Sequence, residues 1–391
     1  MTVNVSKPAI NVREKLAELD KPTGIAGEAM LRADNVPQQA ELLGYRNRNV
    51  IINGSFDIAQ RGTSFSAFTN GYHLDRWSLA TGSAASTIDI EQSTETPDGY
   101  SKSIKLTVDT ADTSAGTNDY VIMGQSIEGL NCQQFAANTS NAKAITVQFW
   151  VRSSVTGTYI CELYSDLGEN LSKSYTIDQA NTWKKVVLVY SPPTNATFSN
   201  DNGRGFLMQF WFLAGSAYSG GSALKTSWDT VNNTRAVGQT NFVAASGNEI
   251  YFTGVQIVAG NYPDGLPFEH RSYGEELALC QRYYYRIDSV YNSGNYQRFA
   301  VASIESATEA EGFFMHPVEM RAIPTLGFSA ASDFHVYTAN AVRAISGLLL
   351  DQSSPTTAGV AITATSMTAG NVGLLNADNN QDAFIEFIAE L

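Results

Sequence analysis

The side chains that could do chemistry are most concentrated in one stretch, PFEHRSYGEELALCQRYYYR, residues 267–286. It contains one histidine, three glutamates, one cysteine and four tyrosines. A thiol activated by an imidazole is a common nucleophilic pair, which Cys280 and His270 could supply if they met. They stand ten residues apart, with the start of a predicted helix between them. We therefore favour a structural interpretation of this stretch over a Cys–His active site.

The pattern of the same stretch predicts a helix. Ser272 and Glu275 form S-x-x-E, a capping box that begins a helix. Four residues then recur at helical spacing and share one face: Tyr273, Leu277, Cys280 and Tyr284. We expect a connecting helix over 271–287, with the Cys280 thiol buried on its apolar face and inert.

Other catalytic motifs are missing from the sequence. It has no H-E-x-x-H, no G-x-S-x-G, no Walker loop and no zinc-ligand spacing, and its four histidines are scattered. Glycoside hydrolysis needs only two carboxylates, and four acids are conceivable for it: Glu162, Asp166, Asp201 and Asp229. We favour solvated turn or strand acids, and we expect no enzymatic activity, no metal and no cofactor. A polysaccharide depolymerase is the enzymatic alternative.

The elements that would position any site are strands. Residues 50–270 contain runs such as SIKLTVD and AITVQFWVRS, in which apolar and polar residues alternate. Gly, Asn, Ser and Pro separate these runs, which is typical of antiparallel sheets with one face buried. GFLMQFWFLAG is apolar on both faces, as a central strand would be. The length fits one jelly-roll β-sandwich.

The outward faces of these strands carry the best binding candidates. If Val147, Phe149 and Val151 point inward, three neighbours on the same strand point outward: Gln148, Trp150 and Arg152. The same argument turns Glu162 and Tyr164 outward and puts Gln209 and Trp211 on one face. Aromatic rings stack on the apolar face of a pyranose, and planar polar groups bind its hydroxyls. Contact with another chain or with a covering loop is the alternative for Trp150 and Trp211.

A long loop, GSAYSGGSALKTSWDTVNNT (215–234), adds two candidates. Loops of this length in a compact domain are usually functional or disordered. Tyr218 and Trp228 are therefore our first candidates for contact with a ligand. The complete set of predicted glycan contacts is Tyr218, Trp228, Trp150, Arg152, Gln148, Trp211 and Tyr164. Loops around 371–382 are a rival location.

The two ends of the chain differ from its centre. Residues 1–49 predict short helices that cannot stand alone in water, so we expect this segment to anchor the chain to another protein or to symmetric copies; a tail packed against its own domain is the alternative. Residues 288–391 predict a smaller C-terminal β domain. The fold class is thus all-β, with a short helical N-terminal segment. HLDRW (73–77) is interpreted as a structural pin.

Charge and cysteine content limit the possible partners. The net charge of −13 argues against binding to nucleic acid, because few phosphates could be neutralised. It argues equally against binding to an anionic membrane. The three cysteines give no disulfide framework. The N-terminus lacks the apolar core of a signal peptide, and no run is long enough to insert into a membrane. We expect a soluble protein made in a cytoplasm.

An ordered series of motifs resembles tail fibres and tail-associated proteins of bacteriophages, marine and cyanobacterial phages among them. The motifs are NVIINGSFDIAQRG (49–62), HLDRW (73–77), VQFWVRSSVTGTY (147–159), TGVQIVAG (253–260) and the stretch 267–286. KPTGIAGEAMLRADNVPQQAELLG and HPVEMRAIPTLGF resemble the flanking segments. The resemblance implies a jelly roll like those of carbohydrate-binding modules, usually trimeric, displayed on the particle and facing the host.

Together these observations predict a component of the virion tail, assembled in the host cytoplasm. Residues 1–49 would bind a tail or adaptor protein, and the β domains would attach the particle to host surface polysaccharide or lipopolysaccharide without covalent chemistry. A homotrimer is expected, because threefold packing stabilises such chains and multiplies weak sugar binding. A purely structural fibre or decoration protein without a ligand is the non-enzymatic alternative.

Overall fold

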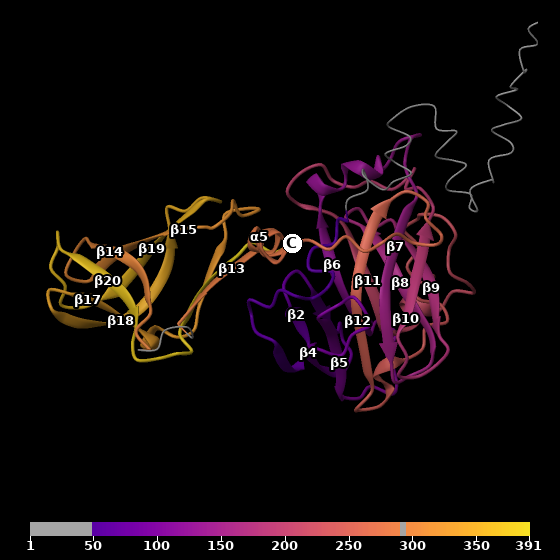
Figure 1. Cartoon of the computed structure of the whole chain (residues 1–391), viewed down its shortest axis with the longest axis horizontal. Helices are drawn as coiled ribbons and strands as arrows, with labels where there is room; N and C mark the ends of the chain where they lie inside the picture. Colours follow the sequence, from indigo (N-terminus) through magenta and orange to yellow (C-terminus); the bar gives the residue numbers. More distant parts are fainter. Residues whose placement is uncertain (1–48, 290–294) are drawn as a thin grey trace, which may run out of the picture. The chain divides into compact units, whose positions relative to one another are not determined.

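The computed structural model describes residues 49–289 and 295–391 (Figure 1). The predicted helical segment 1–49 therefore lies outside the described residues, except for Asn49. The predicted all-β class is confirmed: a jelly-roll sandwich is followed by a smaller C-terminal β region. Among the described residues, no helix has the length and apolarity needed to cross a membrane.

The sandwich consists of two six-stranded antiparallel sheets. Sheet A has the order β1 (Ser64–Phe68), β4 (Thr87–Ser93), β5 (Ser103–Thr110), β12 (Glu249–Ala259), β7 (Ile145–Ser153) and β10 (Lys184–Tyr190). Sheet B has the order β2 (Asn70–Tyr72), β3 (Ser78–Ala80), β6 (Tyr120–Glu128), β11 (Arg204–Ala214), β8 (Gly157–Ser165) and β9 (Asn170–Ile177). Figure 1 shows their long strands running side by side.

Alternation along the strands builds the core between the sheets. Val147, Phe149 and Val151 of β7 are fully buried in it, as predicted. The inward side chains of β8 are Tyr159, Cys161 and Leu163, again as predicted. Each fully buried side chain of this size contributes about 1.5–3 kcal/mol. This burial fixes the register, because a shift by one residue would exchange the inner and outer faces of a whole strand.

A bulge in β12 requires a glycine. The pairing of β12 with β7 shifts register between Thr253 and Gln256. Gly254 lies in this interval with φ 61°, a left-handed conformation that glycine adopts without strain. A Cβ at this position would also come within 2.5 Å of the Tyr100 hydroxyl oxygen. The glycine of the TGVQIVAG motif is therefore explained by backbone geometry.

The C-terminal region has its own sheet, barrel and core. β13 (Tyr284–Asp288), β21 (Phe384–Ile388) and β16 (Thr325–Phe328) form a three-stranded sheet. A closed barrel has the order β14 (Arg298–Ile304), β15 (Glu309–Met315), β19 (Thr357–Ala364), β18 (Ala341–Asp351), β17 (Phe334–Thr338) and β20 (Val372–Ala377). Closing the sheet removes its exposed edges.

The described helices are short. They are η1 (Gly129–Asn131), η2 (Gln133–Phe135), α4 (Ser216–Ser219), η3 (Phe242–Ala244), α5 (Tyr273–Gln281) and η4 (Ala331–Asp333). The helix predicted over 271–287 is α5, but it ends at Gln281 and the chain enters β13 at Tyr284. The prediction was therefore too long at its C-terminal end. The three consecutive tyrosines belong to the turn after the helix and to the strand that pairs with β21.

Candidate functional site

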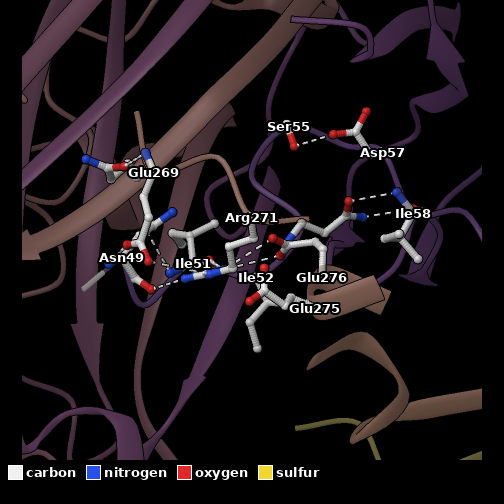
Figure 2. A network of polar contacts seen from close by, with 12 residues as sticks. Asn49, Ile51, Ile52, Ser55, Asp57, Ile58, Glu269, Arg271, Glu275 and Glu276 are labelled. Carbon is white, nitrogen blue, oxygen red and sulfur yellow. Dashed lines mark hydrogen bonds and ion pairs between the residues drawn. The ribbon is translucent and has the colours of Figure 1, made fainter. Parts of the chain in front are cut away.

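The stretch 267–286 is architecture. Ser272 and Glu275 form the predicted capping box at the start of α5. Figure 2 shows Arg271 between this helix and the first described residues of the chain. Its Nη1 donates to the carbonyl oxygen of Ile51 at 3.0 Å and pairs with Glu276 at 3.3 Å, while Nη2 donates to the carbonyl oxygen of Asn49. These charged groups are used to hold α5 against the sandwich.

The Cys–His alternative finds no support in the geometry. Cys280 is fully buried among Ile52, Ile58 and Tyr283, and this burial raises the pKa of its thiol well above the ordinary value. His270 packs instead on the rings of Phe268 and Tyr100, with ring centroids 4.8 and 5.5 Å apart. A buried, protonated thiol is a poor nucleophile. The predicted burial of Cys280 is confirmed.

HLDRW is a structural pin, as predicted. Asp75, Arg76 and Trp77 are all buried. The Trp77 indole donates to the carbonyl oxygen of Asn53 at 3.0 Å, and Arg76 donates to that of Ser126 at 2.7 Å. These bonds satisfy groups that would be costly to bury alone.

Three predicted contacts lie on the outer face of sheet A, where their polar groups already have partners. The Gln148 amide is bonded at both ends to the backbone of Leu266, at 2.7 and 2.8 Å. Arg152 donates to the carbonyl oxygen of Asn181 at 3.1 Å and lies over the ring of Tyr251. Trp150, on the same strand, is half-buried. The backbone around Leu266 therefore covers Gln148.

Three other predicted contacts meet in one pocket on the outer face of sheet B: Tyr164, Tyr218 and Trp211, whose ring is 1% exposed and lies beneath the pocket. The pocket has a volume of about 210 Å³. It is smaller than the roughly 300–1,000 Å³ of sites for drug-sized ligands, so it suits a small group such as a sugar ring. Nine residues line it: Tyr120, Ile122, Tyr164, Arg204, Leu207, Gln209, Trp211, Tyr218 and Arg235.

A buried carboxylate organises this pocket from behind. Glu162 on β8 is 0% exposed and accepts hydrogen bonds from Arg235 Nε and Nη2, both at 2.8 Å. It also accepts from the Trp211 indole at 3.1 Å and from the amide nitrogen of Gln209. Burial alone would lower the pKa of Arg235, but the neighbouring carboxylate raises it above its ordinary value. The guanidinium thus stays charged, and its network with Glu162 fixes three lining side chains.

Aromatic rings surround the Arg235 guanidinium. Its carbon lies 4.5 Å from the ring centroid of Tyr164, 5.1 Å from that of Trp211 and 5.6 Å from that of Tyr218. Contacts of this kind contribute about 0.5–2 kcal/mol each when partly desolvated. Tyr218 also packs against Trp211, with ring centroids 5.3 Å apart. The loop that carries Tyr218 and Arg235 is therefore attached to the sheet through this cage.

One polar atom of the pocket wall is unsatisfied. Gln209 on β11 is 1% exposed, and its amide nitrogen bonds Glu162. Its Oε1 is buried and has no hydrogen-bond partner among the described residues. Buried acceptors are normally bonded, so an orphan in a pocket wall is a feature of interest.

The prediction for Trp228 is wrong. Its ring is 1% exposed and belongs to the core of the sandwich, where it packs against Phe198. Its indole nitrogen donates to the carbonyl oxygen of Ser191 at 2.9 Å. The predicted loop 215–234 folds back at this residue, because burying the large ring is more favourable than exposing it.

Sequence reasoning missed Tyr120, Ile122, Arg204, Leu207 and Arg235 in the lining. Arg235 is the most informative omission. It lies 73 residues from Glu162 in sequence, and no local pattern links the two. The aromatic residue Tyr218 and the acidic residue Glu162 were visible, but the cation that joins them was not.

None of the four acids considered for hydrolysis lines the pocket among the described residues. Glu162 is beneath the surface, and Asp166 pairs with Arg204 at 2.9 Å. Asp229 pairs with Lys225, and Asp201 accepts from the backbone of Gly203. Within residues 49–289 and 295–391, no cluster of His, Cys, Asp and Glu could hold a metal ion.

No protein-family model and no curated protein matches the chain. Among solved structures, the enzymatically active domain of bacteriophage CBA120 tailspike protein 4 is 16% identical with a TM-score of 0.30, covering 54% of this chain and 21% of that one. A family 4 carbohydrate-binding module is 14% identical with a TM-score of 0.29, covering 53% and 97%. TmCBM61, solved with β-1,4-galactotriose, is 10% identical with a TM-score of 0.28, covering 54% and 97%. At these scores the similarities carry no functional argument.

Proposed function

We propose that this protein is a non-catalytic glycan-binding component of a phage tail, which attaches the particle to polysaccharide or lipopolysaccharide on its host. The observation that carries the glycan-binding part is the sheet B pocket. It combines aromatic rings, neutralised guanidinium groups and an unpaired amide oxygen on rigid strands. The tail location rests on the sequence resemblance alone.

The chemistry of the pocket suits a pyranose. Tyr120, Tyr164 and Tyr218 offer rings and hydroxyl groups, and Leu207 adds an apolar surface. A sugar ring has C–H groups that pack on such surfaces and hydroxyls at its edge that need polar partners. Because β8 and β11 are paired strands in the middle of a sheet, the binding groups are held in place before the ligand arrives.

No carboxylate of the described part of the chain lines the pocket, which favours binding over hydrolysis. A glycosidase needs an acid and a base or nucleophile on either side of the scissile bond. Glu162 is the acid nearest in the network, but both of its oxygens already accept hydrogen bonds and it is fully buried. We therefore propose that the pocket holds its ligand without cleaving it.

The proposal also includes a homotrimer, for which the outer face of the barrel offers an apolar surface suited to a protein interface. Val301, Leu374, Tyr337 and Val342 stand opposite one another across four neighbouring strands. Val301, Tyr337 and Val342 are exposed. Contiguous exposed apolar side chains are typical of surfaces that bind another protein. Attachment to a tail or adaptor protein through residues 1–49 is proposed from the sequence.

The test is to mix the purified protein with host surface polysaccharide and separate the mixture by chromatography with light scattering. We expect the protein to elute with polysaccharide of unchanged length, and the free protein to have three times the chain mass. Polysaccharide that becomes shorter would indicate a depolymerase. A protein that elutes alone would favour the purely structural role.

Two variants locate the site. Tyr218→Ala removes a ring from the pocket and should weaken binding at least about tenfold, as expected for a central aromatic contact. Trp150→Ala removes a half-buried ring from the opposite sheet and should leave affinity unchanged. The reverse result would move the site to sheet A.

A further inference from the structure

On the basis of the proposed function, we propose that the pocket selects an uncharged sugar and that Gln209 is its specificity-determining residue, accepting a hydrogen bond from a ligand hydroxyl. The inference extends glycan binding to a chemical class. It depends on how charge and hydrogen bonds are distributed around the pocket.

The two cations in the lining are already neutralised. Arg235 is paired with Glu162 through two hydrogen bonds of 2.8 Å. Arg204 is paired with Asp166 at 2.9 Å. Neither carboxylate is part of the lining, so the guanidinium groups keep donors for a ligand while their charges are balanced. An anionic sugar would find no excess positive charge here.

The net charge of the whole chain also disfavours an anionic ligand. With a net charge of −13, the protein repels a polyanion electrostatically. In dilute salt this repulsion has a range of about 10 Å. An acidic polysaccharide would have to overcome this repulsion without a compensating site. A neutral polysaccharide has no such cost.

A cationic ligand is disfavoured for a different reason. The cage of Tyr164, Trp211 and Tyr218 would suit a cation, but Arg235 already occupies it. A second positive charge beside the guanidinium would be repelled in this partly buried environment. The cage therefore positions Arg235 and is not a binding site for an amine.

Gln209 requires a ligand that can donate a hydrogen bond. Its amide nitrogen is committed to Glu162, which fixes the orientation of the amide and leaves Oε1 as the unpaired acceptor. Only a donor can satisfy this oxygen, and the abundant donors on a neutral sugar are hydroxyls. A site with an unpaired polar group discriminates strongly against ligands that cannot bond to it.

The experiment uses the full-length protein and pairs of polysaccharides that differ only in the oxidation of C6. Suitable pairs are galactan, mannan and glucan, each compared by affinity electrophoresis with the same polymer after oxidation of its C6 hydroxyls to carboxylates. We expect retardation by a neutral member and none by its acidic counterpart. Raising the salt from about 50 to about 500 mM should change the affinity less than about twofold, since no net charge is involved.

The outcomes distinguish failure of the neutral class from failure of glycan binding itself. Retardation by an acidic member, lost in high salt, would overturn the neutral class and leave glycan binding intact. No retardation by any member would count against glycan binding and against the inference with it.

A matched pair of variants tests Gln209. Gln209→Met keeps the shape but removes the acceptor, and should weaken binding of the retained neutral polysaccharide by about 5- to 100-fold. Ser172→Ala removes another hydrogen bond to Glu162, of 3.2 Å, from a residue outside the lining. It should leave affinity unchanged. Equal losses in both variants would mean that Gln209 acts only by supporting Glu162, which would overturn its specificity role.

Discussion

The outer faces of sheets A and B carry the same kinds of side chains but use them differently. Gln148 on β7 and Gln209 on β11 are both buried glutamines that point away from the core. The Gln148 amide is bonded at both ends to the backbone of Leu266, whereas Gln209 is bonded only through its nitrogen. On sheet A the amide of Gln148 holds the loop around Leu266. On sheet B the Oε1 of Gln209 remains an unpaired acceptor in the wall of a pocket.

The ion pairs of the two faces differ in the same way. On sheet A, Lys105 pairs with Glu249 at 3.0 Å where both side chains are partly exposed. On sheet B, the Glu162–Arg235 pair is almost completely buried. A buried pair with all its hydrogen bonds is rigid, and removing one partner leaves a charge in a poor environment. Residue type alone therefore does not identify a binding face. What matters is which polar groups have been satisfied by the fold.

The largest expected effect comes from removing the carboxylate on each face. Glu162→Ala should lower the free energy of unfolding by about 3–5 kcal/mol, because it leaves Arg235 without its partner and the Trp211 indole without an acceptor. Glu249→Ala, on the exposed pair, should cost at most about 1 kcal/mol. Urea denaturation of the two variants measures both values. Similar costs would show that the two faces are not energetically distinct.

A smaller effect is expected at the glutamine of sheet A. Gln148→Met should lower the free energy of unfolding by about 1–2 kcal/mol, because it leaves the partly buried N–H and C=O of Leu266 without partners. Glycan affinity should not change, because Gln148 is not in the pocket lining. Calorimetry of unfolding and a binding titration check the two parts. Loss of binding at unchanged stability would reverse the roles assigned to the two glutamines.

The two faces also show how far the sequence can be interpreted. Period-two alternation predicted correctly that Phe149 points inward and that Trp211 and Gln209 share an outer face, because burial of one face is a local property of the strand. It could not predict that residues around Leu266 cover Gln148, or that Arg235 reaches Glu162. These contacts join segments that are far apart in sequence. The prediction that Trp228 contacts a ligand was wrong for the same reason, because the residues of a loop do not show whether the loop folds back onto the core.

The smallest expected effect is a pH dependence of the stabilisation contributed by the exposed Lys105–Glu249 pair of sheet A. Burial alone would raise the pKa of Glu249, but the Lys105 ammonium bonded to it lowers that pKa below the ordinary 4.5. Burial likewise disfavours charged Lys105, yet the hydrogen bond from Glu249 raises its pKa above 10.5. The pair should therefore stabilise the fold between pH 4.5 and 10.5. This contribution disappears as the pH falls through the folded pKa of Glu249 or rises through that of Lys105.

The difference in unfolding free energy between the wild type and Glu249→Gln should thus be at most about 1 kcal/mol near neutral pH and vanish in acid. Denaturation at several pH values, repeated in high salt, measures it. Salt should reduce the difference, because both side chains reach solvent. A difference that persisted in acid would mean that Glu249 stabilises sheet A through contacts other than its charge. The exposed Lys105–Glu249 pair would then contribute to stability more like the buried Glu162–Arg235 pair than its exposure indicates.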